Sequence, residues 1–396
     1  MDEIGCDVIF LAGHLKGRDE ILSLRGLIER LEQLGHRSRV ICPSIVSDHG
    51  FSDLAECPGL ARRWQRPWSV RTLDLAAPSG RPRLLHVLSA GMAEAGLEIA
   101  EHWRLPYLLC VDEFPRRDAR LRLSRNWCRG LIATNSELAD ALRRDYGVPG
   151  RAIRAIARSV AGSTGQARPI RSGRVPVVGA AGPLVGGSGF STLLTAARKV
   201  IDAGVDAEFV IAGHGDDEGE LRRRADRLRI AERLTFADEI PAGLTFWDVL
   251  DVYCQTSVAP TVGRPLALAM ASGVPSITTD VEGLRTLVKD GETGLTIPHG
   301  DANALARSIV ELLTDRERAR KLGEAGQDAI LGEHHPDREA GRLDEVYGSI
   351  VAAGLGPRDS GLADRIVGYE AASGVDNGRE VGGFGLAAVP WLGPES

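Results

Sequence analysis

Short apolar runs alternate with helical patterns along most of the chain, and this alternation is typical of parallel α/β layers. The first strand is predicted at residues 7–12, and the helix after it carries apolar residues at helical spacing until Gly35 ends it. A second helix of the first half of the chain is predicted at 136–146. The other strands of this half are predicted at 39–42, 84–88, 107–111 and 130–134.

The second half repeats this pattern. A helix that starts near Phe190 has a clean apolar stripe and ends at Gly204, and a later helix is capped by Asp301. Two final helices are predicted at 316–330 and 337–353. Strands are predicted at 175–179, 209–212, 234–236, 252–254, 276–278 and 295–298.

Composition divides the chain into four parts. Residues 1–160 are predicted to form an N-terminal Rossmann-like domain and residues 175–353 a C-terminal one. Residues 161–174 are rich in small and polar residues, which is typical of an interdomain linker. Residues 354–396 contain ten glycines, a density too high for a packed domain, so we expect a mobile tail there.

Net charge and cysteine usage narrow the function classes. A formal net charge of -6 argues against a nucleic-acid binder, because such proteins carry a basic surface. The N-terminus lacks the basic region and long apolar core of a signal peptide, so a cytoplasmic protein is expected, with peripheral membrane contact left open.

The six cysteines contain no C-x-x-C pair and are predicted to be reduced core residues. No metal and no cofactor is expected.

Five ordered motifs in the second half carry a resemblance to a known family. The most informative is Ala-Leu-Ala-Met-Ala-Ser-Gly-Val at 267–274, followed by Pro275. Residues 278–283 continue this motif. The other four motifs lie at 177–185, at 209–215, at 233–236, and at 288–295 with 300–306. Together they resemble the retaining GT-B glycosyltransferases of family 4, also called glycosyltransferase group 1. The first half fits more loosely, through a glycine loop at Lys16 and Gly17 and through 84–87 and 133–138.

The resemblance implies an α/β GT-B fold, in which two Rossmann-like domains with parallel sheets face each other across a cleft. It implies transfer of a hexosyl or related sugar from a nucleotide-sugar donor to a glycan or lipid-linked acceptor with retention, as in polysaccharide biosynthesis. The donor would bind the C-terminal domain at the carboxyl ends of its strands.

The phosphate-binding loop departs from the family pattern. The family places an arginine and a lysine where this chain has Pro183 and Ser188. The family glycines Gly182 and Gly189 are kept. Gly186, Gly187 and Gly189 leave open an anion-binding loop of bare backbone amides ahead of the helix that starts at Phe190. The best replacement cation is Arg264, although a solvent-facing arginine is an equally good interpretation.

Three further positions of the family pattern are changed. The two family glutamates that contact the sugar and the ribose correspond to Pro260 and Leu268, which cannot make those hydrogen bonds. Gly263 is kept between them. In the first domain, Asp112 stands where the family has a histidine near the transferred sugar, and it is either a base or a plain loop residue.

Two main functions from different classes stay open, beside a weaker third one, a sugar-phosphate or nucleotide binding module without transfer. One is a working glycosyltransferase, whose activity the missing donor-site residues put in question. The other is a non-catalytic GT-B homologue, or pseudoenzyme, that acts as partner or regulator of an active glycosyltransferase. The basic and aromatic stretch at 62–71 fits either a membrane surface or lipid-linked acceptor, or a partly exposed loop.

Overall fold

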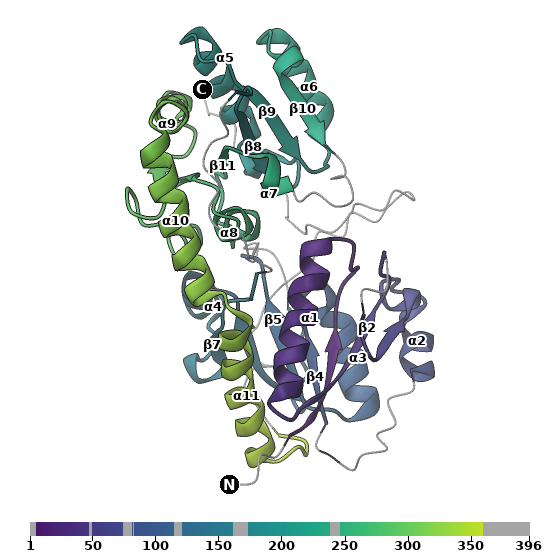
Figure 1. Ribbon diagram of the computed structural model, residues 1–396. Coiled ribbons are helices and arrows are strands. Elements are labelled where there is room, and N and C mark those ends of the chain that lie inside the picture. The colour runs from purple at the N-terminus through teal and green to yellow at the C-terminus, as the bar shows by residue number, and fades with distance from the viewer. Residues whose placement is uncertain are drawn as a thin grey trace. The chain divides into compact units, whose positions relative to one another are not determined.

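Figure 1 shows the computed structural model, which describes residues 5–46, 50–73, 81, 83–114, 121–160, 173–237 and 246–358. Most of the predicted linker and residues 359–396 of the predicted tail lie outside the described residues. The described chain forms two compact units. The first contains the residues up to 160 and those from His334 onward, and the second contains residues 173–333.

A parallel sheet forms the centre of the first unit. Its seven strands follow the order β3-β2-β1-β4-β5-β6-β7, so the strand order reverses direction between β1 and β4. The strands are β1 (Asp7–Leu11), β2 (Arg37–Cys42), β3 (Leu54–Glu56), β4 (Arg83–Val87), β5 (Tyr107–Val111), β6 (Cys128–Ala133) and β7 (Ile153–Ala155).

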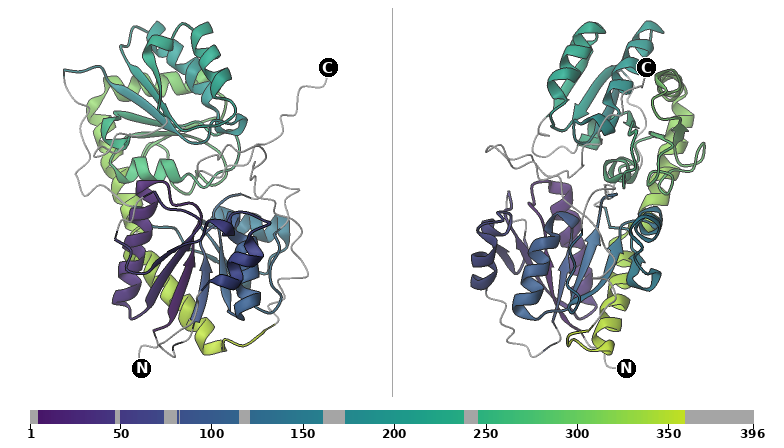
Figure 2. Two further views of the ribbon diagram at one scale, coloured as in Figure 1. Left: turned by 90° about the vertical axis from the view of Figure 1, so that its right-hand side faces the viewer. Right: turned by 180° about the vertical axis from the view of Figure 1, so that it is seen from behind.

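Helices cover both faces of this sheet, with α1 and α11 on one face and α3 on the other (Figure 2). Asn135 caps α4 by accepting a hydrogen bond from the amide of Leu138, which satisfies one of the free amides of its first turn. The helices are α1 (Arg18–Gln33), α2 (Arg66–Thr72), α3 (Ala93–Trp103), α4 (Ser136–Tyr146) and α11 (Pro336–Ala353).

Helix α11 belongs to the first unit although it is the last described helix of the chain. The sequence predicts 337–353 as part of the C-terminal domain, whereas the structure packs α11 against α1 (Figure 1). The buried stripe of α11, including Leu343 and Tyr347, joins the same core cluster as Phe10 of β1. The reason is hydrophobic: without α11, that face of the sheet would be partly exposed to water.

The second unit has its own parallel sheet. The six strands follow the order β10-β9-β8-β11-β12-β13, and the order reverses between β8 and β11. The strands are β8 (Val177–Ala181), β9 (Glu208–Ala212), β10 (Leu234–Ala237), β11 (Val252–Gln255), β12 (Ser276–Thr279) and β13 (Leu295–Ile297). Two parallel, Rossmann-like sheets are therefore confirmed, while the cleft between them stays a prediction.

Six helices flank the second sheet. Asp301 caps α9 as predicted, because its carboxylate accepts hydrogen bonds from the amides of Asn303 and Ala304. The helices are α5 (Phe190–Asp202), α6 (Glu218–Arg227), α7 (Phe246–Val249), α8 (Arg264–Ala271), α9 (Ala302–Thr314) and α10 (Arg316–Glu333). Among the described helices, none is both long and apolar enough to cross a bilayer.

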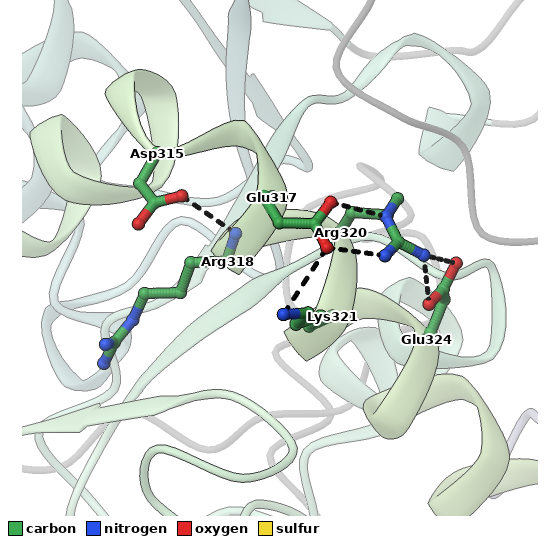
Figure 3. Close-up of polar contacts among 6 residues, drawn as sticks. All are labelled: Asp315, Glu317, Arg318, Arg320, Lys321 and Glu324. Atoms are coloured by element: carbon green, nitrogen blue, oxygen red, sulfur yellow. Dashed lines mark hydrogen bonds and ion pairs between the residues drawn. The ribbon is translucent and has the colours of Figure 1, made fainter.

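Helix α10 fixes the position of α8. A side chain at Gly323 would lie 2.4 Å from the carbonyl oxygen of Gly273, so the small residue allows the close approach. The Gln327 side chain donates a hydrogen bond to the carbonyl of Ala271 at 3.0 Å. Exposed ion pairs among Glu317, Arg320, Lys321 and Glu324 line the first turns of α10 (Figure 3). Such solvent-facing pairs contribute little to stability.

Candidate functional site

The carboxyl ends of the central strands of the second sheet form one edge of the second unit. In open parallel sheets, ligands bind at this edge where the strand order reverses. Here the reversal lies between β8 and β11. The loops that begin at Gly182 and Thr256 follow these two strands, so the sequence-predicted donor residues gather at the expected place.

Glycines allow the loops at this edge to pack backbone against backbone. Gly189 has a φ of +72°, and a side chain there would lie 1.8 Å from the carbonyl oxygen of Thr256. Gly213 has a φ of +141°, and a side chain there would lie 1.9 Å from the carbonyl oxygen of Gly182. Both positions therefore require glycine, because any Cβ would overlap a main-chain atom.

Ser188 is occupied within its own loop. Its hydroxyl is buried and donates a 2.6 Å hydrogen bond to the carbonyl of Pro183. Its own carbonyl accepts a hydrogen bond from the Thr256 hydroxyl at 3.1 Å. The amide of Val258 donates to Gly187 at 3.0 Å and ties the same two loops together. The side chain that occupies the lysine position therefore stabilises the loop.

Two helices begin at this edge on left-handed glycines. Helix α5 starts at Phe190 after Gly189, and α8 starts at Arg264 after Gly263, which has a φ of +68°. Neither helix has a side-chain cap, so no capping side chain accepts a hydrogen bond from the main-chain amides of its first turn. Helix N-termini of this kind attract anions through their amides and dipole. Arg264 is half-buried and takes part in interactions of its own.

The two positions of the missing glutamates differ in their surroundings. Leu268 is buried within α8 with 4% of its surface exposed, so it packs in the core as the sequence predicts. Pro260 is exposed in the loop that leads to α8. Neither residue offers a hydrogen-bonding side chain.

A buried polar network supports the loop between β11 and α8, and sequence reasoning missed it. The Tyr253 hydroxyl lies 2.6 Å from Oε1 of Gln255, whose amide donates to the Ser257 hydroxyl at 2.9 Å. The Thr279 hydroxyl donates to the carbonyl of Ser257 at 2.6 Å. The available signal was the run of polar residues that ends two otherwise apolar strands. This network holds the loop in one conformation.

The candidate residues of the first unit are bound to their neighbours. Gly17 is the N-cap of α1 with a φ of -84°, a conformation open to any residue, and Lys16 precedes it. Asp112 follows β5, and its Oδ1 accepts a hydrogen bond from the amide of Ala90 at 3.1 Å. Ala90 is the first residue of the short helix that leads into α3, so this hydrogen bond stabilises the start of that helix. A catalytic role for Asp112 stays a prediction.

His86 has a structural position. It lies within β4, is 3% exposed and forms a hydrogen bond with the Tyr347 hydroxyl. Burial, with a smaller contribution from the charge of Arg158, lowers the pKa of His86 to about 3, so the imidazole is neutral. Across the residues that the structure describes, no three histidine, cysteine, aspartate or glutamate side chains are grouped to hold a metal ion.

Each half of the chain matches a glycosyltransferase family model. The model for glycosyl transferases group 1 matches residues 175–315, and the model for Glycosyltransferase Family 4 matches residues 23–161. The first match covers the second sheet, and the second match covers the first sheet from β2 to β7.

Individual relatives are similar over part of the chain. A phosphatidyl-myo-inositol mannosyltransferase of Mycobacterium leprae is 31% identical over 42% of this chain and 44% of its own length. A lipopolysaccharide core biosynthesis glycosyltransferase of Rhizobium meliloti is 29% identical over 45% of this chain and 50% of its own. The chain thus spans about half the length of these curated relatives.

Among solved structures, an Anabaena protein in complex with UDP-glucose superposes with a TM-score of 0.68. The match covers 87% of this chain and 99% of that one, at 16% identity. This likeness concerns the fold alone.

Proposed function

Because the chain belongs to the GT-B glycosyltransferases, we propose that it transfers a sugar from a nucleotide-sugar donor to a glycan or lipid-linked acceptor with retention. In the reaction, the bond between the anomeric carbon and the diphosphate oxygen breaks. A bond from that carbon to an acceptor hydroxyl oxygen forms, and the hydroxyl proton leaves with the diphosphate. The protein has to bind the diphosphate and stabilise its developing charge.

One observation carries the donor-site proposal. Helices α5 and α8 both begin at the same edge of the second sheet, each on a left-handed glycine, Gly189 and Gly263. The main-chain amides of these first turns can donate to phosphate oxygens, and the helix dipoles favour the negative charge. In this proposal, Arg264, the first residue of α8, supplies a side-chain cation next to those amides.

The changed positions predict weak donor binding. A charge-assisted hydrogen bond is worth about 1.5–3 kcal/mol, so two missing cations weaken diphosphate binding by roughly two to four powers of ten. Ser188 cannot compensate because its hydroxyl already donates to Pro183. We therefore expect a transferase that works only at high donor concentration.

The test is a panel of sugar nucleotides, including UDP-glucose and GDP-mannose, measured by thermal shift and by donor hydrolysis. The proposal predicts that sugar nucleotides with one particular base raise the thermal stability of the protein saturably and that the protein hydrolyses such a donor. Arg264→Ala should lose both effects. Arg318→Ala is a matched control in the same unit, because the exposed Arg318 near the start of α10 pairs with Glu311 of α9 and lies outside the loops of the candidate site. Binding without any turnover would exclude the transferase.

A second candidate is a non-catalytic partner or regulator of an active glycosyltransferase. It is favoured by the way two of the changed positions are used: Ser188 bonds within its loop, and Leu268 packs in the core. Both side chains therefore contact other parts of the protein and are not positioned to hydrogen-bond a donor. This candidate predicts that the purified protein neither binds nor hydrolyses any donor, and that an active transferase co-purifies with it.

The proposed place of action is the cytoplasmic side of a membrane. A lipid-linked acceptor would require the protein to reach a bilayer surface. Peripheral contact is therefore part of the proposal. Cell fractionation with a salt wash measures it: release from membranes by salt is expected of a protein held at the surface by charge.

A further inference from the structure

Two tryptophans of the first unit point away from its core. Trp64 is 74% exposed and Trp68 is 72% exposed, the largest exposed fractions among the large apolar side chains of the described chain. Trp68 lies on α2 and Trp64 in the turn before it. An indole is a large apolar group with one polar atom, and its exposure to water is costly unless another surface covers it.

The segment that carries them is firmly anchored. Arg66 of α2 is buried, donates to the carbonyl of Leu60 at 3.1 Å and forms an ion pair with Glu94 at 2.7 Å. The Trp103 indole of α3 donates to the carbonyl of Val70 at 3.1 Å. Figure 1 shows α2 at the outside of the first unit beside α3. The exposure of the tryptophans is therefore held in place by the fold.

Helical spacing separates an inner from an outer face. Arg66 and Val70, four residues apart, are buried against the unit. Trp64 and Trp68 have the same spacing, two residues earlier, and face outward. One face of this short segment thus holds it to the protein, and the other presents two indoles to the surroundings.

The exposed part of this segment is also cationic. Residues 57–73 contain four arginines and no acidic residue. One of them, Arg66, pairs with Glu94 and Glu98. The other three, Arg62, Arg63 and Arg71, are exposed, and none forms an ion pair with a carboxylate inside the described ranges. We call these three arginines and the two tryptophans the Trp-Arg face.

We propose that the Trp-Arg face docks the protein on an anionic phospholipid bilayer. Indoles insert at the boundary between headgroups and acyl chains, where the ring is buried and its N–H stays near water. Arginines beside them attract the negative surface. A neutral glycan could stack on the indoles but would leave the three cations unused. The inference specifies the peripheral contact in the proposed function and does not depend on sugar transfer.

The test is co-sedimentation of the full chain with vesicles, without any sugar nucleotide. The vesicles contain phosphatidylcholine alone or an equal mixture of phosphatidylcholine and phosphatidylglycerol. The proposal predicts binding to the mixed vesicles, weaker binding as salt is raised, and a blue shift of tryptophan fluorescence on binding. Equal binding to both vesicle types, or none to the mixed vesicles at low salt, would overturn it.

Variants locate the surface. Trp64→Gln/Trp68→Gln should reduce vesicle affinity at least tenfold and abolish the blue shift. Arg62→Gln/Arg63→Gln/Arg71→Gln should reduce affinity by about fivefold per arginine. The control Arg143→Gln/Arg144→Gln/Arg151→Gln removes three exposed arginines elsewhere in the same unit and should bind like wild type. Wild-type binding by the tryptophan variant would contradict the proposal, as would quenching of these indoles by a soluble oligosaccharide without vesicle binding.

Discussion

The imidazole Nδ1 of His86 on β4 lies 2.7 Å from the hydroxyl oxygen of Tyr347 on α11. The two residues are 261 positions apart, and both are buried. Their rings meet edge to face at 5.9 Å. The hydrogen bond is therefore a direct link between the sheet of the first unit and the helix that returns to it from the second.

The burial of His86 predicts a pH dependence of stability. The folded pKa of His86 is lowered to about 3, against 6.5 for an unperturbed histidine, so the unfolded chain binds the extra proton between these values. The free energy of unfolding should fall as pH drops below about 6.5, by up to about 1.4 kcal/mol per pH unit, from this residue alone. Urea unfolding from pH 7 to pH 4 measures it.

Two variants isolate the contribution of His86. His86→Gln lacks the titrating group, so the stability advantage of wild type over this variant should shrink as pH falls. Tyr347→Phe keeps the histidine and should lose about 1–3 kcal/mol at pH 7 while keeping the pH dependence. A difference between wild type and His86→Gln that stays constant with pH would refute the assignment.

The two family glutamate positions should respond differently to a carboxylate. Leu268→Glu places a charge in a site that is 4% exposed, so we expect a loss of about 3 kcal/mol or more in the free energy of unfolding. Pro260→Glu changes an exposed loop residue and should cost about 1 kcal/mol or less. Thermal unfolding of both variants tests the contrast, and equal losses would contradict the burial of Leu268.

Gly189 and Gly204, at opposite ends of α5, form a matched pair. Their φ values are +72° and +79°, so alanine carries the same left-handed strain of about 1–2 kcal/mol at either position. At Gly204 nothing lies within 4 Å of the added Cβ, whereas at Gly189 it would meet Thr256 at 1.8 Å. Gly189→Ala should therefore unfold at clearly lower urea concentration than Gly204→Ala. Similar midpoints would argue against the close contact of the two loops.

The sequence predicts the layers well, because the strands of both sheets are short apolar runs bounded by turn residues. The helix at 136–146 matches α4, whose cap at Asn135 and left-handed Gly147 are both local signals. Strands β3 and β7 were missed because each three-residue strand contains a charged residue, Glu56 or Arg154, and so shows no apolar run. The place of α11 was missed because tertiary packing decides which sheet its apolar stripe covers.

The candidate site was predictable in position but not in detail. The family resemblance located the loop that begins at Gly182 and the loop that ends at Gly263, and both glycines have positive φ values, +149° and +68°, that favour glycine. The use of Ser188 as a loop bond and the network from Tyr253 to Ser257 depend on contacts between segments far apart in sequence. A pattern of residue types cannot show such contacts.

The central claim is that main-chain amides at the starts of α5 and α8 bind the donor diphosphate. Calorimetric titration of UDP and GDP into three proteins tests it most directly: wild type, Gly263→Ala and Gly291→Ala. Both glycines have left-handed φ values, +68° and +71°, but a side chain at Gly263 would lie 2.5 Å from Leu284, while nothing lies near Gly291. We expect weak, saturable binding of one nucleotide by wild type and Gly291→Ala, and an affinity at least tenfold lower in Gly263→Ala. Absence of binding by wild type, or unchanged binding by Gly263→Ala, would contradict it.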